Sequence, residues 1–210
     1  MRSKPVDKLL LTIIGIIIVA GFIIFTSASL GLLARSSGAS FSHVLMPQVG
    51  AVFLGCIIAY VASRIRYTFW RRWSFFIFLA SLFITLLVFV PSIGLEYGGG
   101  KRWIDLRFIS FQPAELLKIA FVMYAAAWLS TFKEKEVTFR KGMLPLVVML
   151  AVTGGILLQQ PDTDTFVSIF LAGMGMFIVA GGKFRHLLML FIISVIGLSA
   201  LIFMRPYLMQ

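Results

Sequence analysis

Residues 9–30 read LLLTIIGIIIVAGFIIFTSASL and contain no charged side chain. A helix that crosses the hydrocarbon core of a bilayer needs about 20 predominantly apolar residues, and this run meets that length. Basic residues before it and small residues after it also fit a cleaved signal peptide, but the apolar region of a signal peptide is only about 7–15 residues long. The run therefore predicts a retained transmembrane helix.

The composition of the whole chain has the same character. Of the 210 residues, 60% are hydrophobic and 13% are charged, and the mean hydropathy is +1.01. Soluble domains are about half apolar and about a quarter charged, so these charges are too few to cover a water-facing surface. The composition excludes a soluble domain, a disordered chain, a fibrous repeat and a disulfide-stapled scaffold. The single cysteine, Cys56, has no partner for an internal disulfide.

Six more apolar runs follow the first. They lie at about Val44–Ser63, Trp73–Ser92, Pro113–Thr131, Met143–Gln160, Thr165–Gly181 and Leu187–Met204. We therefore predict an all-α fold, a polytopic integral membrane bundle of about seven transmembrane helices that forms a single membrane domain over residues 1–210.

The distribution of basic residues predicts the orientation of the bundle. Most of the 19 Lys and Arg residues fall in the segments on the same side as the N-terminus. Cytoplasmic loops carry the excess of Lys and Arg, so the N-terminus is expected inside and the C-terminus outside. The net charge of +11 then reflects topology, and no nucleic acid partner is predicted. Residues 93–112 become an outer loop and residues 160–165 an outer turn.

The outer loop carries a cluster of positive charge against this bias. Lys101 and Arg102 stand beside Trp103, after the glycines 98–100 and before Asp105 and Arg107. Such a cationic cluster can hold phosphate or pyrophosphate. The alternative is an interfacial anchor, in which Trp lies in the headgroup layer and the basic side chains reach lipid phosphates. Both interpretations stay open from the residues alone.

The next apolar run begins with ionisable residues. Pro113 suits the first position of a helix, and Glu115 complements its positive end. Lys118 lies three residues further on, so it shares a helix face with Glu115 and can pair with it. A lysine at this depth usually faces a bundle interior or a water-filled cavity. The plainer alternative is a capping residue with a self-neutralising pair.

The turn QPDTDT at residues 160–165 carries two carboxylates. Pro161 ends the preceding helix, and capping the next one takes only one of the polar residues that follow. Asp162 is a candidate for pairing with Lys118, for binding a divalent cation, or for mutual pKa shifts with its neighbour. For Asp164 we expect a simple helix cap.

Several familiar signatures are missing from the sequence. It holds no GxxxxGK[ST], no HExxH, no Cys/His cluster and no GxSxG. His43 and His186 fall in predicted loops on opposite sides. Gly173 and Gly175 are typical of a close helix-packing face.

Three stretches together resemble a known family. They are KRWIDL at 101–106, FQPAELLKIAFVMYAAAWL at 111–129 and LLQQPDTDT at 157–165. The chain resembles the shape, elongation, division and sporulation (SEDS) family of bacterial membrane proteins along essentially its whole length. The match is closest to the division branch, FtsW, with RodA next, and residues 26–29 (TSAS) also fit that branch.

The resemblance implies both an activity and its setting. Family members are peptidoglycan glycosyltransferases of about ten helices, each about 20 residues long. They polymerise lipid II, an undecaprenyl-pyrophosphate-linked substrate, at the outer face of the bacterial plasma membrane. They work with a class B penicillin-binding transpeptidase and other divisome membrane proteins. The resemblance to the division branch implies that this protein is located at the division septum.

The resemblance also implies roles for particular residues. Arg102 and Trp103 belong to an outer-loop signature, and with Lys101 they would bind the substrate pyrophosphate. The polar wall of the family's central cavity, which would position the catalytic base, corresponds to Gln112, Pro113, Glu115, Lys118 and Asp162. The chemistry needs a carboxylate to take a proton, and positive charge or a metal ion at the leaving pyrophosphate. A divalent cation is therefore a cofactor candidate.

The chain departs from the family pattern in three places. Thr163 and Asp164 replace a Leu-Gly pair, and Leu208 stands where the family commonly has Arg. The family's catalytic aspartate would lie beyond Gln210. We therefore expect residues 1–210 alone to bind lipid-linked substrate weakly and to polymerise nothing.

Two other functions remain open at this point. A lipid II flippase would use the intramembrane pair Glu115–Lys118 as a gate. A non-catalytic divisome scaffold would need neither residue.

Overall fold

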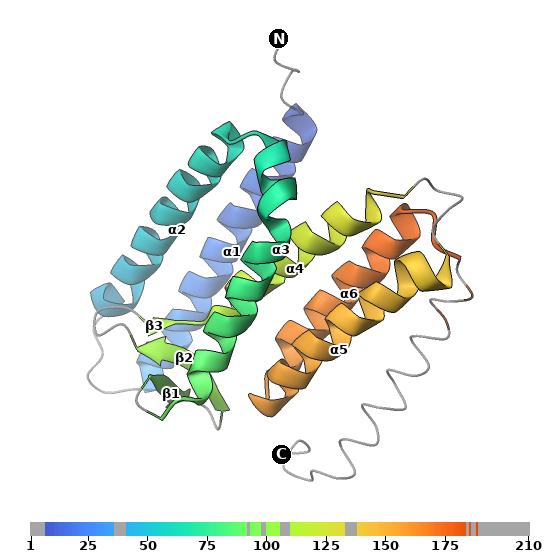
Figure 1. The fold of residues 1–210 in the computed structure, drawn as a ribbon. Coiled ribbons are helices and arrows are strands. Elements are labelled where there is room, and N and C mark those ends of the chain that lie inside the picture. The colour runs from blue at the N-terminus through green and yellow to red at the C-terminus, as the bar shows by residue number, and fades with distance from the viewer. Residues whose placement is uncertain are drawn as a thin grey trace. The chain divides into compact units, whose positions relative to one another are not determined.

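The computed structural model describes residues 7–35, 41–91, 93–97, 100–105, 110–132, 138–183, 185 and 188. Within them the chain is mostly helical (Figure 1) and divides into two compact units, Met1–Ile65 (unit 1) and Arg66–Gln210 (unit 2). Apart from Leu188, the predicted helix at 187–204 lies outside the described residues, as do Arg107, His186 and Leu208.

Unit 1 consists of two long apolar helices. Helix α1 spans Lys8–Arg35 and α2 spans Phe41–Arg64, and the two contact each other. Nearly all of their described side chains are exposed although most are apolar. Exposed helices of this kind satisfy their own backbone hydrogen bonds and offer apolar side chains to lipid. The spans Lys8–Leu30 and Leu45–Arg64 agree with the first two predicted runs.

Unit 2 contains the remaining described helices. They are α3 (Tyr67–Leu86), the 3-10 helix η1 (Leu87–Phe89), α4 (Pro113–Leu129), the π-helix η3 (Phe139–Met143), α5 (Leu144–Gln159) and α6 (Thr163–Val179). Helix α3 starts before the predicted Trp73, because arginines near a helix end reach out of the apolar layer and do not interrupt the helix.

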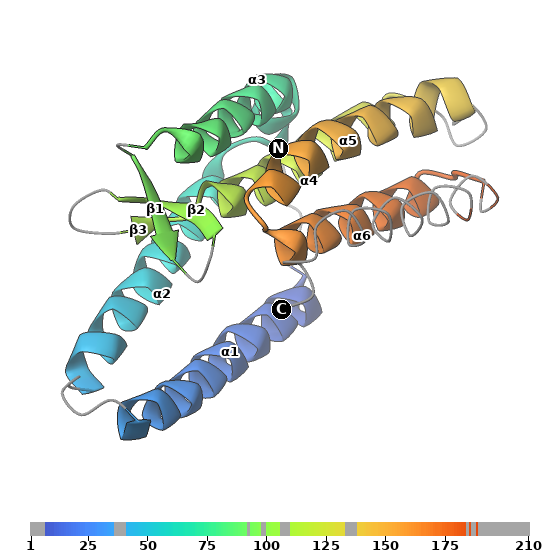
Figure 2. The ribbon, with the colours of Figure 1, turned by 90° about the horizontal axis from the view of Figure 1, so that it is seen from below.

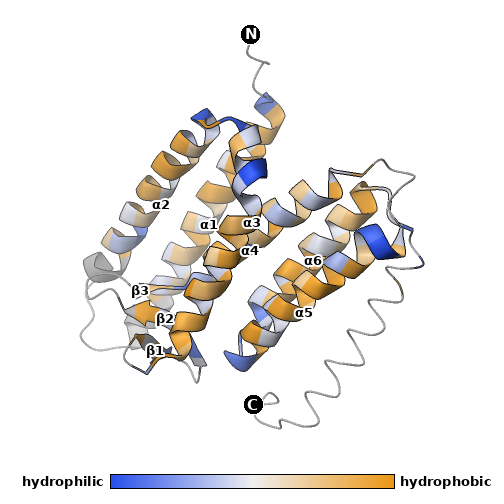
Figure 3. Ribbon diagram, in the orientation of Figure 1, coloured by the Kyte–Doolittle hydropathy of each residue, from blue (hydrophilic) through white to orange (hydrophobic). Residues whose placement is uncertain are grey.

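The described helices make this a multi-pass membrane protein. Four helical stretches are long and apolar enough to cross a bilayer. Two of them lie in unit 1, and the two in unit 2 are Tyr67–Phe89 and Phe139–Gln159. Helices α4 and α6 have 17 residues each, which is about 26 Å and slightly short of the hydrocarbon core. Figure 3 shows the apolar residues concentrated along the helices.

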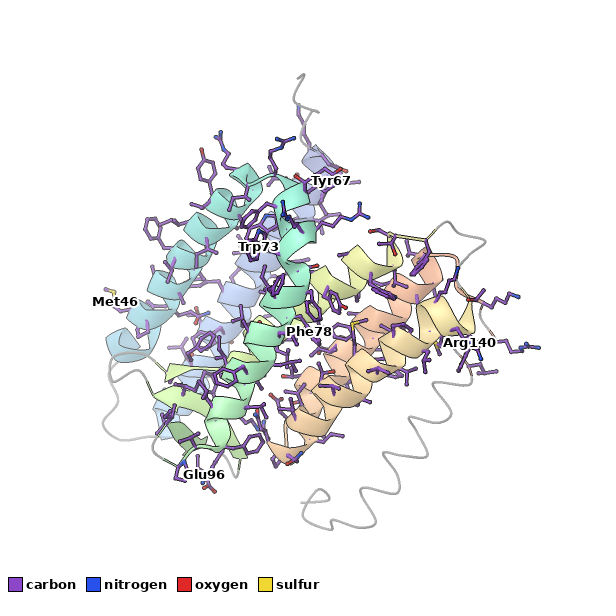
Figure 4. All side chains as sticks on the ribbon, viewed as in Figure 1. Met46, Tyr67, Trp73, Phe78, Glu96 and Arg140 are labelled. Atoms are coloured by element: carbon purple, nitrogen blue, oxygen red, sulfur yellow. The ribbon has the colours of Figure 1, made fainter. Side chains whose placement is uncertain are left out.

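The core of unit 2 lies between its helices. Phe78 of α3, labelled in Figure 4, stacks on Tyr124 of α4 at 5.4 Å and meets Phe121 edge-on. Ala120 and Ala125 of α4 are fully buried, and such small residues let membrane helices approach closely.

The two glycines predicted at a packing face behave differently. A Cβ on Gly173 of α6 would touch Phe121 and Leu146 at 3.4 Å, which confirms close packing there. Gly175 is exposed and has open space around it among the described residues, so it is not part of a packing face between the described helices.

A small antiparallel sheet occupies the loop predicted at 93–112, where the all-α expectation held no strands. Its strands are β1 (Gly94–Tyr97), β2 (Gly100–Asp105) and β3 (Ser110–Phe111), in the order β1-β2-β3. Tyr97 pairs with Gly100, leaving two glycines between them, and Gly-Gly is a favoured two-residue hairpin connection. Figures 1 and 2 show the sheet between the end of α3 and the start of α4.

Candidate functional site

The predicted site residues gather at the end of unit 2 that carries the sheet. Strand β2, the first turn of α4 and the turn between α5 and α6 (residues 160–162, the α5–α6 turn) are joined there by side-chain hydrogen bonds. Residues 50 or more positions apart in the sequence therefore meet in one place.

Arg102 joins β2 to the α5–α6 turn. Its Nε donates to the carbonyl oxygen of Gln160 at 3.2 Å, and one Nη donates to the carbonyl oxygen of Pro161. These carbonyls follow the last turn of α5, where helices leave acceptors unsatisfied and a cation is favoured. Three of the five guanidinium N–H donors are not used in these contacts.

A β-bulge sets the direction of the Arg102 side chain. Leu95 pairs with Trp103 and Glu96 pairs with Lys101, so Arg102 is an extra residue in β2 with no partner opposite it. Bulges of this kind re-aim side chains and increase local twist. The buried Gly100 lets the strand come close, because a Cβ there would lie 2.9 Å from both Arg102 Nε and Gln160 O.

Gln160 extends these contacts to α3. Its side chain is 1% exposed, and its Nε2 donates to the carbonyl oxygen of Thr85 at 2.9 Å. Its Oε1 is buried without a hydrogen-bond partner among the described residues. Neither Gln160 nor Thr85 was predicted as a site residue, because Gln160 stands at the end of an apolar run and Thr85 lies within one.

Asp162 is the N-cap of α6. It is 2% exposed; Oδ1 accepts a hydrogen bond from the Thr165 backbone N–H at 3.4 Å, and Oδ2 accepts one from Gln112 Nε2 at 3.0 Å. The expectation that Asp164 is the cap was wrong, because Asp164 lies exposed within the first turn. Through Gln112, the residue preceding α4, this carboxylate joins the starts of two helices.

Glu115 and Lys118 form an ion pair on α4, as the spacing predicted. Lys118 Nζ lies 2.9 Å from Glu115 Oε1, and the two side chains are 32% and 55% exposed, respectively. Lys118 thus pairs with Glu115 and not with Asp162. Both groups lie on the accessible side of α4.

The three residues expected at the pyrophosphate have different surroundings. Lys101 is exposed on β2, whereas Arg102 is partly buried against the α5–α6 turn. Trp103 lines a hollow of about 240 Å³ together with Leu95, Glu96 and Ser110. The side chain of Asp105 is outside the described part of the structure.

The described residues contain no group of three or more His, Cys, Asp or Glu side chains that could hold a metal ion.

Comparison with known proteins places these features in context. Residues 7–210 match a family model described as cell cycle protein, which covers FtsW, RodA and SpoVE. The chain is 31% identical over 209 residues to a probable peptidoglycan glycosyltransferase FtsW of Geobacter sp. (strain M18), covering 100% of this chain and 57% of that protein. It is 33% identical over 190 residues to a protein of the same name from Nitrosococcus halophilus (strain Nc4), covering 90% and 49%.

Solved structures share the fold. Thermus thermophilus rod shape determining protein RodA superposes with a TM-score of 0.67 at 24% identity, covering 89% of this chain and 57% of RodA. A chain of a peptidoglycan synthase complex that coordinates polymerization and crosslinking gives 0.66 at 25% identity, covering 90% and 56%. The chain spans about half the length of the curated relatives it matches.

Proposed function

Because this chain belongs to the cell cycle protein family of FtsW, RodA and SpoVE, we propose that it supplies part of a peptidoglycan glycosyltransferase acting in cell division. The observation that carries the proposal is the match along 100% of this chain to a protein named as a probable FtsW glycosyltransferase. The substrate would be lipid II, and the location the division septum of the bacterial plasma membrane.

We place the sheet end of unit 2 outside the cell, in a bundle of about seven helices with the N-terminus inside. Tyr67 and Glu96 lie at opposite ends of unit 2 in Figure 4. Arg66, Arg71 and Arg72 stand at the Tyr67 end, which is therefore expected to face the cytoplasm. The substrate headgroup would then approach the sheet.

The contacts assign two different roles to the polar residues at this end of unit 2. Arg102, Gln112 and Asp162 hold β2, α4 and the α5–α6 turn together. Lys101 and Lys118 carry more accessible charges, and positive charge stabilises a leaving pyrophosphate. Glu115 orients Lys118. In this arrangement Arg102 acts as a positioning residue that joins β2 to the α5–α6 turn.

A class B penicillin-binding transpeptidase is the partner that we propose. This is supported by the similarity to a chain of a complex that coordinates polymerization and crosslinking.

Replacing Lys118 by alanine is expected to lower lipid II polymerisation by the whole protein with its transpeptidase at least about tenfold. The matched control is Lys183→Ala, which removes an exposed lysine and should leave the rate within about twofold. Glycan product is measured by gel electrophoresis of labelled lipid II.

Two other results would favour the rival functions. A flippase moves labelled lipid II across vesicle membranes, loses this movement with Lys118→Ala and makes no glycan. A scaffold makes no glycan and still captures the transpeptidase when Glu115, Lys118 and Asp162 are alanine.

A further inference from the structure

A groove lies at the other end of unit 2, away from the sheet. It has a volume of about 390 Å³ between the start of α3 and the C-terminal half of α4. Tyr67, Trp70 and Arg71 line it from α3, and Met123, Ala126 and Ala127 are among its residues on α4. The groove thus has an apolar floor on α4 and a cationic, aromatic rim on α3.

The guanidinium of Arg71 has no carboxylate partner among the described residues. The ion pair found among the described residues is Lys118–Glu115. The sequence holds no acidic residue between Asp7 and Glu96. Arg64 provides a contrast, because its guanidinium donates to Tyr60 Oη and stacks over the Tyr60 ring at 4.8 Å. Arg71 therefore presents an exposed guanidinium without a carboxylate partner among the described residues.

The chemistry of the groove matches one class of ligand. A guanidinium binds phosphate through paired N–H donors, Trp and Tyr rings favour the headgroup layer, and the small α4 residues leave an apolar channel for an acyl chain. Basic pockets between transmembrane helices bind anionic lipid headgroups. We propose that this groove binds an anionic phospholipid, with its phosphodiester on Arg71 and an acyl chain along Met123, Ala126 and Ala127.

This lipid site lies at the opposite end of unit 2 from the candidate glycosyltransferase site, and the proposal for it does not depend on the proposed function. General attraction of basic residues to an anionic leaflet would act equally on Arg71 and its neighbour Arg72. Both are exposed, but only Arg71 lines the groove. Comparing these two arginines therefore separates a specific site from the charge of the segment.

The test is native mass spectrometry of the purified protein with phosphatidylglycerol or with phosphatidylcholine of the same acyl chains. We expect saturable binding of phosphatidylglycerol that Arg71→Gln weakens about tenfold, while Arg72→Gln weakens it no more than about threefold. Ala127→Leu fills the groove without changing the charge and should also weaken binding. Elution volume and thermal midpoint show that each variant is folded.

Three outcomes would overturn the proposal. Equal losses in Arg71→Gln and Arg72→Gln would indicate unspecific attraction. Equal binding of the two lipids would exclude recognition of the anionic headgroup. Binding that survives both Arg71→Gln and Ala127→Leu would show that the groove is covered by another part of the chain or lies unused.

Discussion

Replacing Arg102 by alanine is expected to lower the free energy of unfolding by about 2 kcal/mol, because two carbonyl acceptors of the α5–α6 turn lose a charged donor. For a chain of this size that corresponds to a thermal midpoint about 4–8 °C lower in detergent. Arg102→Lys should restore less than half of the loss, because an ammonium lacks the planar fork that reaches both carbonyls. Circular dichroism during heating measures each midpoint.

Lys101→Ala is the matched control for this change. It removes the same charge from the neighbouring residue of β2, but Lys101 is exposed, so the loss should stay within about 0.5 kcal/mol. If Arg102→Ala left the midpoint unchanged and abolished only substrate binding, Arg102 would be a ligand for pyrophosphate and the positioning role would be wrong.

Asp162→Ala is expected to cost about 2 kcal/mol of unfolding free energy, because α6 loses its N-cap and the amide of Gln112 loses its acceptor. Asp162→Asn should stay within about 0.5 kcal/mol of the natural protein, because Asn caps helices as well as Asp does. The Gln112 amide can reverse, so that its oxygen accepts a hydrogen bond from the new amide. Thermal midpoints of the two variants are compared.

Asp164→Ala supplies the control for Asp162, since Asp164 is exposed in the same first turn. Its effect should not exceed about 0.5 kcal/mol. Asp162→Asn keeps the capping oxygen but removes the negative charge. If this variant is stable and polymerises normally, Asp162 acts only as the helix cap. A stable variant without activity would instead show that the negative charge itself serves the substrate or a cation.

The apolar runs were the part of the fold that could be predicted well. Spans such as Lys8–Leu30 follow from length and hydropathy, because the bilayer imposes both. The sheet was not predicted, since β1, β2 and β3 are only two to six residues long. Strands this short carry little periodic signal and depend on their pairing.

The candidate site could be predicted in part. The pair Glu115–Lys118 follows from helical spacing alone. The hydrogen bond from Gln112 to Asp162 and the contact of Arg102 with Gln160 and Pro161 join residues 50 to 59 positions apart. Such contacts depend on how helices pack, and the bulge that turns Arg102 toward the α5–α6 turn leaves no mark in the composition of β2.

These contacts separate the residues that hold β2, α4 and the α5–α6 turn together from the residues that are free to contact substrate. Arg102, the most conspicuous cation of the loop, is engaged with the backbone of the α5–α6 turn, whereas Lys101 stays exposed. We therefore propose that Lys101 and Lys118, and not Arg102, carry the charges that bind substrate at this end.

Cysteine labelling of intact cells tests most directly whether the sheet end of unit 2 faces the outside of the cell. In a Cys56→Ser background, Lys101→Cys and Arg72→Cys each put one thiol at an exposed position, at opposite ends of unit 2. A membrane-impermeant maleimide is expected to label Lys101→Cys in intact cells and Arg72→Cys only after permeabilisation. Labelling of Arg72→Cys in intact cells, with Lys101→Cys protected until permeabilisation, would place the sheet in the cytoplasm and contradict the proposed function.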